Sequence, residues 1–280
     1  MFSAAATRQF RPTDAELFDC QVIVDPPADG CWNMALDEAL LESAEAEGRV
    51  YLRFYQWREP TLSLGYFQSY SDRTSHATSA DCKIVRRATG GGAILHHHEL
   101  TYSIALPQAH PLARQAEDLY LAVHQSLVDT LAMLGIQARC RETTNDFTIP
   151  TAPAAAEPFL CFQRATVGDV VVPAQSGASA NAYTFKVGGS AQRRRQCAVL
   201  QHGSILLKKS PFAPELPGIV DLSGTNLSSD QLLETWPNRL AKTLQLMATS
   251  SSSVLSDDIL TTAGQIRAAK FAHLDWTKKR

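Results

Sequence analysis

The fold of this chain is organised around KIVRRATGGGAILHHHELTYSIALP, residues Lys83–Pro107. A β-branched run ends in Arg86 and Arg87, three glycines follow at positions 90–92, and an alternating apolar segment closes the stretch. Glycine backbone can approach a ligand closely, and the two arginines place positive charge beside it. The pattern indicates a site for an anionic or carbonyl-bearing substrate. Its alternative is a glycine bulge between two strands with solvated arginines.

Outward from this stretch, alternating segments predict strands, and apolar residues three or four apart predict helices. Strands are expected over Gln21–Asp25, Val50–Trp57, Thr61–Phe67, Lys83–Arg87, Ala93–His96, Leu100–Leu106, Gln137–Arg141 and Ala198–Leu207. Helices are expected over Cys31–Gly48, Arg114–Leu134, Ser229–Met247 and Asp257–Phe271. We expect Pro237 to kink or break the third helix. The mixture predicts an α/β (α+β) fold of mixed β-sheets with packed helices.

The length of 280 residues fits one domain. We expect residues 1–18 to form a loose N-terminal arm and residues 19–280 to form a single domain, with helices in its C-terminal part, 228–280. Two segments rich in Pro, Ala, Ser and Gly, Thr148–Pro158 and Pro173–Ala182, predict mobile loops. Between these loops lies an apolar segment that contains Cys161.

The composition narrows the class of protein. A net charge of -2 gives no global basic field, so we expect no nucleic-acid partner. No segment approaches the roughly 18 apolar residues of a membrane helix, and the first residues lack the apolar region of a secretory signal. We therefore expect a cytoplasmic protein without a membrane partner. The six cysteines are scattered without a C-x-x-C pair, which indicates neither a zinc ribbon nor a disulfide framework.

Three charged or metal-binding patterns have simpler structural interpretations. Five carboxylates in the first predicted helix predict a solvated face rather than a catalytic acid pair. Neighbouring histidines on a strand alternate faces, so His96–His98 cannot all bind one ion, and we expect no metal site. The basic groups Arg193–Arg195 and Lys208–Lys209 predict solvated or docking surfaces. The five carboxylates are Asp37, Glu38, Glu42, Glu45 and Glu47.

Five sequence blocks, in order, resemble the biotin/lipoate protein ligase and octanoyltransferase superfamily. The blocks are WNMALDEALL at 32–41, RFYQWREPTLSLGYFQ at 53–68, RRATGGGAILHHHELTYS at 86–103, KVGGSAQ at 186–192 and LQHGSILL at 200–207. The order makes the signal specific, whereas the triple glycine alone would be weak. The resemblance implies the superfamily's catalytic-domain fold, in which a mixed sheet encloses an acyl tunnel.

The resemblance implies two alternative activities. A Cys-Phe pair ahead of the KVGGSAQ block is similar to the cysteine-dependent transferases, which move an octanoyl or lipoyl group from acyl-carrier protein, through an acyl-cysteine, to a lysine. The acceptor would be a lipoyl domain or the glycine-cleavage H protein, and no cofactor would be needed. The alternative is a lipoate-protein ligase that uses ATP and Mg to form lipoyl-adenylate. Three features leave the ligase activity as an alternative: Gly92, His97 and the pair Asn145–Asp146.

In the transferase, the family's nucleophile matches Cys161 and its supporting lysine matches Lys186. A thiol exchanges with a thioester at little cost in free energy, and the new thioester can acylate an amine without ATP. An ammonium beside a thiol lowers the thiol pKa from about 8.5 and favours the thiolate. Backbone N–H groups of a turn at 188–191 would suit the oxyanion. The expected substrate-binding residues are Arg86, Arg87, Gly90, Gly91, Gly92, His96, Gly188, Gly189, Ser190, Ala191 and His202.

Overall fold

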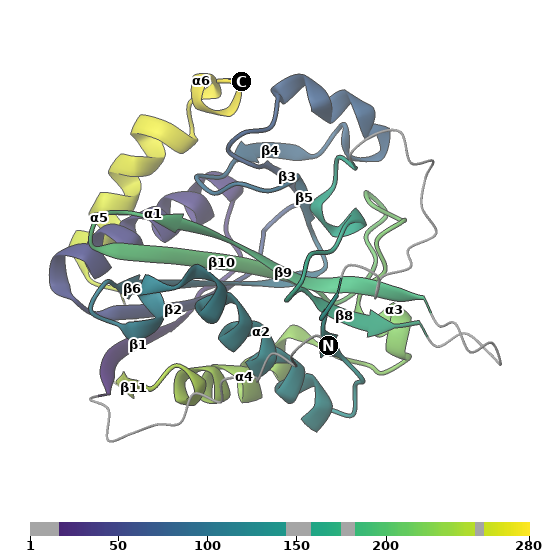
Figure 1. Ribbon diagram of the computed structural model, residues 1–280. Coiled ribbons are helices and arrows are strands. Elements are labelled where there is room, and N and C mark those ends of the chain that lie inside the picture. The colour runs from purple at the N-terminus through teal and green to yellow at the C-terminus, as the bar shows by residue number, and fades with distance from the viewer. Residues whose placement is uncertain (1–16, 144–157, 175–182, 250–254) are drawn as a thin grey trace, which may run out of the picture.

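The computed structural model describes residues 17–143, 158–174, 183–249 and 255–280 (Figure 1). Its strands are β1 Phe18–Val24, β2 Val50–Tyr55, β3 Thr61–Leu64, β4 Lys83–Arg86, β5 Ile94–His96, β6 Glu99–Pro107, β7 Arg139–Cys140, β8 Val170–Pro173, β9 Thr184–Arg194, β10 Ala198–Leu206 and β11 Leu246–Thr249. Its α-helices are α1 Gly30–Glu47, α2 Ala116–Met133, α3 Ile219–Ser223, α4 Ser229–Thr243, α5 Asp257–Ile266 and α6 Leu274–Thr277. Most of the predicted arm lies outside the described residues, and Phe18 already belongs to β1.

The strands form two mixed sheets, which confirms the predicted α/β class. The larger sheet has the order β11-β1-β2-β6-β10-β9-β8-β7, and the smaller has the order β4-β3-β5. β1 is parallel to both of its neighbours, β2 and β11, whereas β2, β6, β10 and β9 follow one another antiparallel. The smaller sheet contains β4 and β5, so the opening Lys83–Pro107 stretch crosses from one sheet to the other.

Helices cover both faces of the larger sheet (Figure 1). Val50, Leu52 and Phe54 of β2 pack with residues of α2 and α4, whereas Tyr51 between them packs with residues of α1 and α5. This alternation follows from the two-residue period of a strand. The central strands β6 and β10 are buried along their whole lengths, so the functional residues that they carry sit on a rigid support.

The C-terminal part differs from the expectation at two points. Pro237 lies inside the continuous helix α4 and does not break it. The buried Trp236 beside it, whose indole N–H donates to Ser126 Oγ at 2.9 Å, anchors the helix against α2, and such burial can offset the roughly 3 kcal/mol cost of an internal proline. The helix also ends at Thr243, four residues early. After Gln245 with φ of 55°, the chain forms β11, which pairs with β1.

No helix in the described part of the chain is long and apolar enough to cross a bilayer. The two predicted mobile loops fall mainly outside the described residues. Between them, a short 3-10 helix at Cys161–Gln163 follows a bridge between Leu160 and Ala93. This bridge fixes Cys161 beside the glycine stretch, at the edge of the smaller sheet.

Candidate active site

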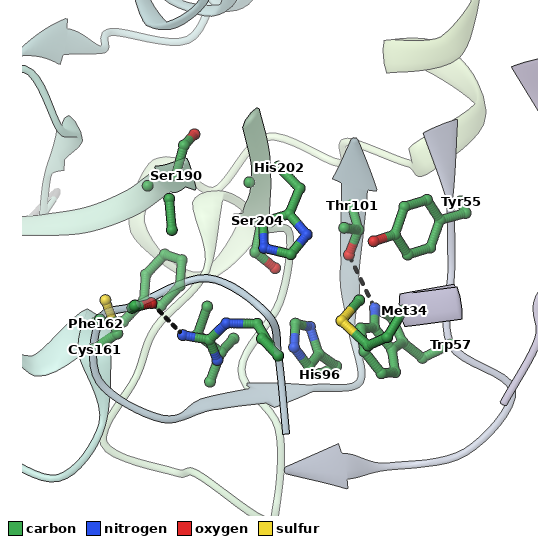
Figure 2. A pocket seen from close by; sticks show the side chains of 17 residues that line it. Met34, Tyr55, Trp57, His96, Thr101, Cys161, Phe162, Ser190, His202 and Ser204 are labelled. Carbon is green, nitrogen blue, oxygen red and sulfur yellow. Dashed lines mark hydrogen bonds between the residues drawn. The ribbon is translucent and has the colours of Figure 1, made fainter. Parts of the chain in front are cut away.

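A largely apolar cavity lies between the two sheets and encloses about 470 Å³, its open mouth included. In Figure 2, Cys161 and Phe162 lie at one end of the view and Met34, Tyr55 and Trp57 at the other. Among the substrate-binding residues expected from the sequence, Arg87, Gly90, Gly91, His96, Gly189, Ser190, Ala191 and His202 line it, as does Cys161.

Cys161 and Lys186 are close together although 25 residues separate them. Lys186 Nζ lies 3.7 Å from Cys161 Sγ, and the Lys186 side chain is only 5% exposed. Lys186 is on β9, and Cys161 is on the 3-10 helix that the glycine stretch holds in place. The backbone N–H of Cys161 donates to Ala93 O at 2.7 Å. The fold therefore places an ammonium beside a thiol at one end of the cavity.

Asp169 is the counter-ion of Lys186 and was missed by the sequence analysis. Its Oδ2 lies 3.0 Å from Lys186 Nζ, and its side chain is fully buried. Tyr120 O–H donates to Oδ1 at 2.5 Å, and the backbone N–H of Thr166 donates to Oδ2 at 2.6 Å. Gly168–Asp169 directly before the apolar strand β8 is the available sequence signal. The result is a row in which a partly exposed thiol is followed by a buried ammonium and a buried carboxylate.

The glycine stretch folds around the guanidinium of Arg87. Arg87 donates to Ser63 O and Ser63 Oγ, both at 2.7 Å, and to the carbonyls of Gly90 and Gly92 at 3.1 and 2.9 Å. Burial lowers the pKa of Arg87 to about 10, and the charge of Cys161 opposes this shift. Gly91 needs glycine because its φ is 92°.

Gly92 lets the Cys161 segment approach. A Cβ on Gly92 would lie 3.1 Å from Cys161 N and 3.2 Å from Cys161 Cα. The third glycine, which the sequence suggested as a ligase-like feature, thus has a packing reason in this chain.

Arg86 lies outside the cavity, contrary to its expected place. Its guanidinium is fully buried and donates to the carbonyls of Gly65 and Gln68, at 2.9 and 2.7 Å, and to Thr277 O at 2.9 Å. These bonds join the smaller sheet to α6. Neighbouring side chains on a strand point to opposite faces, so only one of the two arginines can face the cavity from here.

His96 belongs to a buried hydrogen-bonded row in the cavity wall. Because the carboxylate of Glu99 can only accept, His96 Nδ1–H donates to Glu99 Oε1 at 2.5 Å, and Nε2 of the neutral ring accepts from the Ser63 hydroxyl at 2.7 Å. The ring stacks on Trp57 with 3.8 Å between centroids. Burial lowers the pKa of His96 more than Glu99 raises it. His96 is thus held as a neutral, fixed wall residue.

His202 is held by Asp37, which the sequence analysis placed wrongly on a solvated face. His202 Nδ1 donates to Asp37 Oδ2 at 3.0 Å, and its Nε2 lies 2.7 Å from Thr89 Oγ1. Asp37 also accepts from Arg53 at 2.8 Å. Burial alone would raise the pKa of Asp37, but the hydrogen bond from His202 and the charge of Arg53 outweigh it and hold that pKa low.

Glu38 is also buried, against the same prediction, and pairs with Lys270 at 2.5 Å. Helix α1 is covered by the sheet on one side and by α5 and its π-helical continuation Arg267–Phe271 on another. Its acidic residues therefore point into protein, and only the distal ones, such as Glu42 and Glu47, are less enclosed.

Gly188, Gly189, Ser190 and Ala191 form part of β9 rather than the expected turn. They pair with β10, Gly188 opposite Ile205 and Ala191 opposite His202. Glycine is needed at 189, where a Cβ would lie 2.4 Å from Lys186 Cε. The expected oxyanion turn is thus replaced by part of β9, the strand that also carries Lys186.

A second polar row reaches the cavity at Ser190. Ser190 Oγ lies 2.5 Å from Tyr102 O–H and 2.6 Å from His124 Nε2. His124 Nδ1 lies 2.7 Å from Gly168 O, a carbonyl that can only accept, so Nδ1 donates and Nε2 accepts from Ser190. Burial lowers the pKa of His124 to about 4. Sequence reasoning missed this histidine because it sits in the apolar pattern of α2.

His97 and His98 lie in the connection between β5 and β6 and stack on each other, with 3.7 Å between ring centroids. The argument from alternating strand faces therefore does not apply to them. Across the described ranges, no group of three His, Cys, Asp or Glu residues is arranged to hold a metal ion. Asn145–Asp146 lies outside the described residues.

Comparison with known proteins identifies the family. The model of the lipoyl protein ligase A/B catalytic domain matches residues 29–213, which include Cys161, Lys186 and most of the cavity wall. The chain belongs to this family. Two similar curated proteins are Octanoyltransferase LipM of Carboxydothermus hydrogenoformans, 38% identical over 64% of this chain and 61% of that protein, and that of Anoxybacillus flavithermus, 30% identical over 89% of this chain and 94% of that protein. The chain is thus an acyltransferase of the octanoyltransferase branch.

Two solved structures of lipoate-protein ligases have a fold similar to that of this chain. Lipoate-protein ligase A bound with ATP is 17% identical, with a TM-score of 0.69 over 93% of this chain and 99% of that one. An archaeal bi-partite lipoate protein ligase from Thermoplasma acidophilum, described with its E2 lipoyl domain, is 18% identical, with a TM-score of 0.66 over 93% of this chain and 96% of that one. At this identity, the likeness concerns the fold alone.

Proposed function

We propose that this protein transfers an octanoyl group from acyl-carrier protein, through a thioester on Cys161, to a lysine of a lipoyl domain or of the glycine-cleavage H protein. The observation that carries the proposal is the 3.7 Å approach of Lys186 Nζ to Cys161 Sγ at the end of an apolar cavity. Similarity to octanoyltransferases over most of the chain supports the acyl group.

The first half-reaction needs a thiolate, and the ammonium of Lys186 favours it. The Cys161 thiolate attacks the thioester carbonyl of the donor, and a new C–S bond forms at Cys161. The bond to the carrier sulfur breaks, and the departing thiolate takes a proton from Lys186. Asp169, which is 3.0 Å from Lys186 Nζ, holds the lysine in line during this exchange.

The second half-reaction restores both groups. Neutral Lys186 takes one proton from the acceptor's ammonium, and the freed amine attacks the acyl-Cys161 carbonyl. The amide bond forms, the C–S bond breaks, Cys161 leaves as thiolate, and the amine's second proton goes to solvent. The product amide is more stable than the thioester, so no ATP enters the cycle.

The ATP-dependent alternative assigns the arginine-glycine stretch to phosphate. Arg87 instead donates to the stretch's own carbonyls and to Ser63, and Arg86 donates to carbonyls away from the cavity. Each guanidinium has one buried nitrogen without a hydrogen-bond partner, Arg86 Nη2 and Arg87 Nε. The other nitrogens are already bonded, and phosphate could bind them only by breaking these bonds. Their engagement supports the transferase over the ligase.

The test is the complete transfer. Purified protein is mixed with a lipoyl domain and either octanoyl-acyl-carrier protein without ATP, or free lipoate with ATP and Mg. We expect the domain to gain one octanoyl group in the first mixture. Modification in the second mixture alone would replace this proposal with the ligase.

A further inference from the structure

Met34 forms part of a wall between two cavities. Behind the main cavity lies a second, smaller one of about 240 Å³, open space at its mouth included, and Met34 and His202 are the described residues that line both. In Figure 2, Met34 lies at the end of the main cavity away from Cys161. An acyl chain that is bound to Cys161 and fills the cavity therefore runs toward Met34.

The two wall residues differ in how firmly they are held. His202 is bonded at both ring nitrogens, to Asp37 at 3.0 Å and to Thr89 at 2.7 Å. Met34 is buried, 3% exposed, in an apolar cluster with Tyr55 and Trp57. Its unbranched thioether adapts to its surroundings. Met34 is thus the part of the wall that a substitution can open without breaking a polar network.

The lining of the second cavity suits an aliphatic chain once the Met34 side chain is shortened. Its free surface is mainly apolar, and Leu41 and Leu200 are among its lining residues. Its charged neighbours already have partners: Asp37 pairs with Arg53, Glu38 pairs with Lys270 at 2.5 Å, and Arg193 donates to Ala88 O at 3.3 Å. Methylene groups that enter this space would not strip a free charge of its water.

We propose that Met34 sets the longest acyl chain that the enzyme accepts. Met34 closes the cavity opposite the nucleophile, so a chain with additional methylenes must displace its side chain. Met34→Ala joins the two cavities and lengthens the accepted chain, whereas Met34→Phe fills the end and shortens it. The inference rests on the proposed function, because it requires an acyl chain on Cys161.

The test is a competition among acyl-carrier proteins that bear hexanoyl, octanoyl, decanoyl and dodecanoyl groups, read as the mass of the Cys161 adduct. A methylene in an apolar pocket is worth about tenfold or more in discrimination. Neighbouring acyl groups in this series differ by two methylenes. We therefore expect Met34→Ala to raise the decanoyl-to-octanoyl ratio by at least about tenfold, and Met34→Phe to raise the hexanoyl-to-octanoyl ratio by at least about tenfold. Met34→Leu, which conserves volume, should keep the wild-type profile.

Two controls separate this role from general damage. Leu41→Ala enlarges the second cavity but leaves the wall, so alone it should not change the profile. Met247→Ala, which removes a half-exposed methionine of β11, is the control for loss of a methionine and should keep the wild-type chain profile. Unchanged chain profiles in both Met34→Ala and Met34→Phe, with a normal wild-type octanoyl adduct, would overturn the inference and leave the proposed function standing. If the Met34→Ala protein fails to fold, the chain profile of Met34→Phe alone tests the inference. A wild-type protein that forms no adduct would overturn both.

Discussion

At the scale of single residues, the proposed mechanism depends on how Asp169 holds Lys186. Asp169 is the buried counter-ion of this lysine, at 3.0 Å from its Nζ, and a buried ion pair that loses one partner is strongly destabilised. Tyr120 and Thr166 fix the carboxylate through hydrogen bonds. Lys186 supplies the positive charge, and the Asp169 carboxylate fixes the position of that charge.

We predict that Asp169→Asn slows the acylation of Cys161 by about 10- to 100-fold, because Lys186 loses the counter-ion that positions it beside the thiol. The measurement is the rate of octanoyl adduct formation, together with the rate at which iodoacetamide labels the Cys161 peptide at neutral pH. The matched control is Tyr120→Phe, which removes a hydrogen bond to Asp169 but keeps the Asp169 carboxylate. Equal rates in Asp169→Asn and wild type would contradict this role.

His124 makes stability depend on pH. Its pKa is about 4 in the folded state and about 6.5 in an unfolded chain. Between these values the unfolded state binds the additional proton, so stability falls as pH falls. When the pH is lowered from 7 to 5, this group reduces the free energy of unfolding of the wild type by about 2 kcal/mol.

We therefore predict that His124→Gln, compared with wild type, gains about 2 kcal/mol in relative free energy of unfolding when the pH is lowered from 7 to 5. Urea unfolding at both pH values measures it. His273→Gln, at an exposed position, should show no such change. A His124→Gln variant whose difference from wild type is the same at both pH values would refute the assignment.

At the scale of elements, glycine positions decide how the Cys161 segment and the glycine stretch fit together. Gly65 follows β3, and a Cβ there would lie 1.9 Å from Gly91 O. The Gly91 carbonyl cannot move without moving the stretch that holds Arg87 and borders Cys161. Gly264 in α5 has nothing within 4 Å of its Cβ position.

We predict that Gly65→Ala lowers the free energy of unfolding by about 2 kcal/mol and reduces transfer at least tenfold, because such a clash must be relieved by backbone movement. Gly264→Ala should raise stability by up to about 1 kcal/mol and leave transfer unchanged. Thermal unfolding and the transfer assay measure both variants. A fully active Gly65→Ala protein would show that the stretch does not need this geometry.

The sequence predicted most elements but not their ends or partners. Periodicity identified α1 and α2, yet it assigned Asp37 to solvent, because a pattern on one helix does not show what packs on its other side. Leu246 and Met247 were placed at the end of the predicted helix Ser229–Met247 but belong to β11, since the free edge of β1 offers backbone partners. Such tertiary pairing is invisible in a local window.

The candidate site was predictable where motifs carried it. Cys161 and Lys186 were found through the resemblance, and the structure brings them together. Asp169 and His124 were missed because single polar residues in apolar segments resemble ordinary core positions. Arg86 shares its motif with Arg87, and only the strand's alternation separates their roles.

At the scale of the whole molecule, two sheets meet around the main cavity, and the proposed function requires carrier proteins to reach its mouth. Lys208 and Lys209 follow β10, whose Ser204 lines the cavity, and both lysines are exposed. Exposed charges act mainly on encounter rates and are screened by salt. They are suitable for docking an acidic carrier.

We predict that the double reversal Lys208→Glu and Lys209→Glu raises KM for the acyl-carrier donor several-fold at low salt and leaves kcat unchanged. The difference should fade as salt is raised toward 0.5 M, in a steady-state titration. Lys242→Glu, at an exposed site on α4, is the control for net charge. A KM that is unaffected by the double reversal at low salt would exclude this docking surface.

The central claim is that Cys161 carries the acyl group, and intact-protein mass tests it most directly. The protein is mixed with octanoyl-acyl-carrier protein without ATP, beside Cys161→Ser and beside Cys197→Ser, which removes an exposed cysteine. We predict one octanoyl adduct on wild type and Cys197→Ser, and none on Cys161→Ser. An adduct that persists in Cys161→Ser, or a wild type that forms none, would contradict the claim.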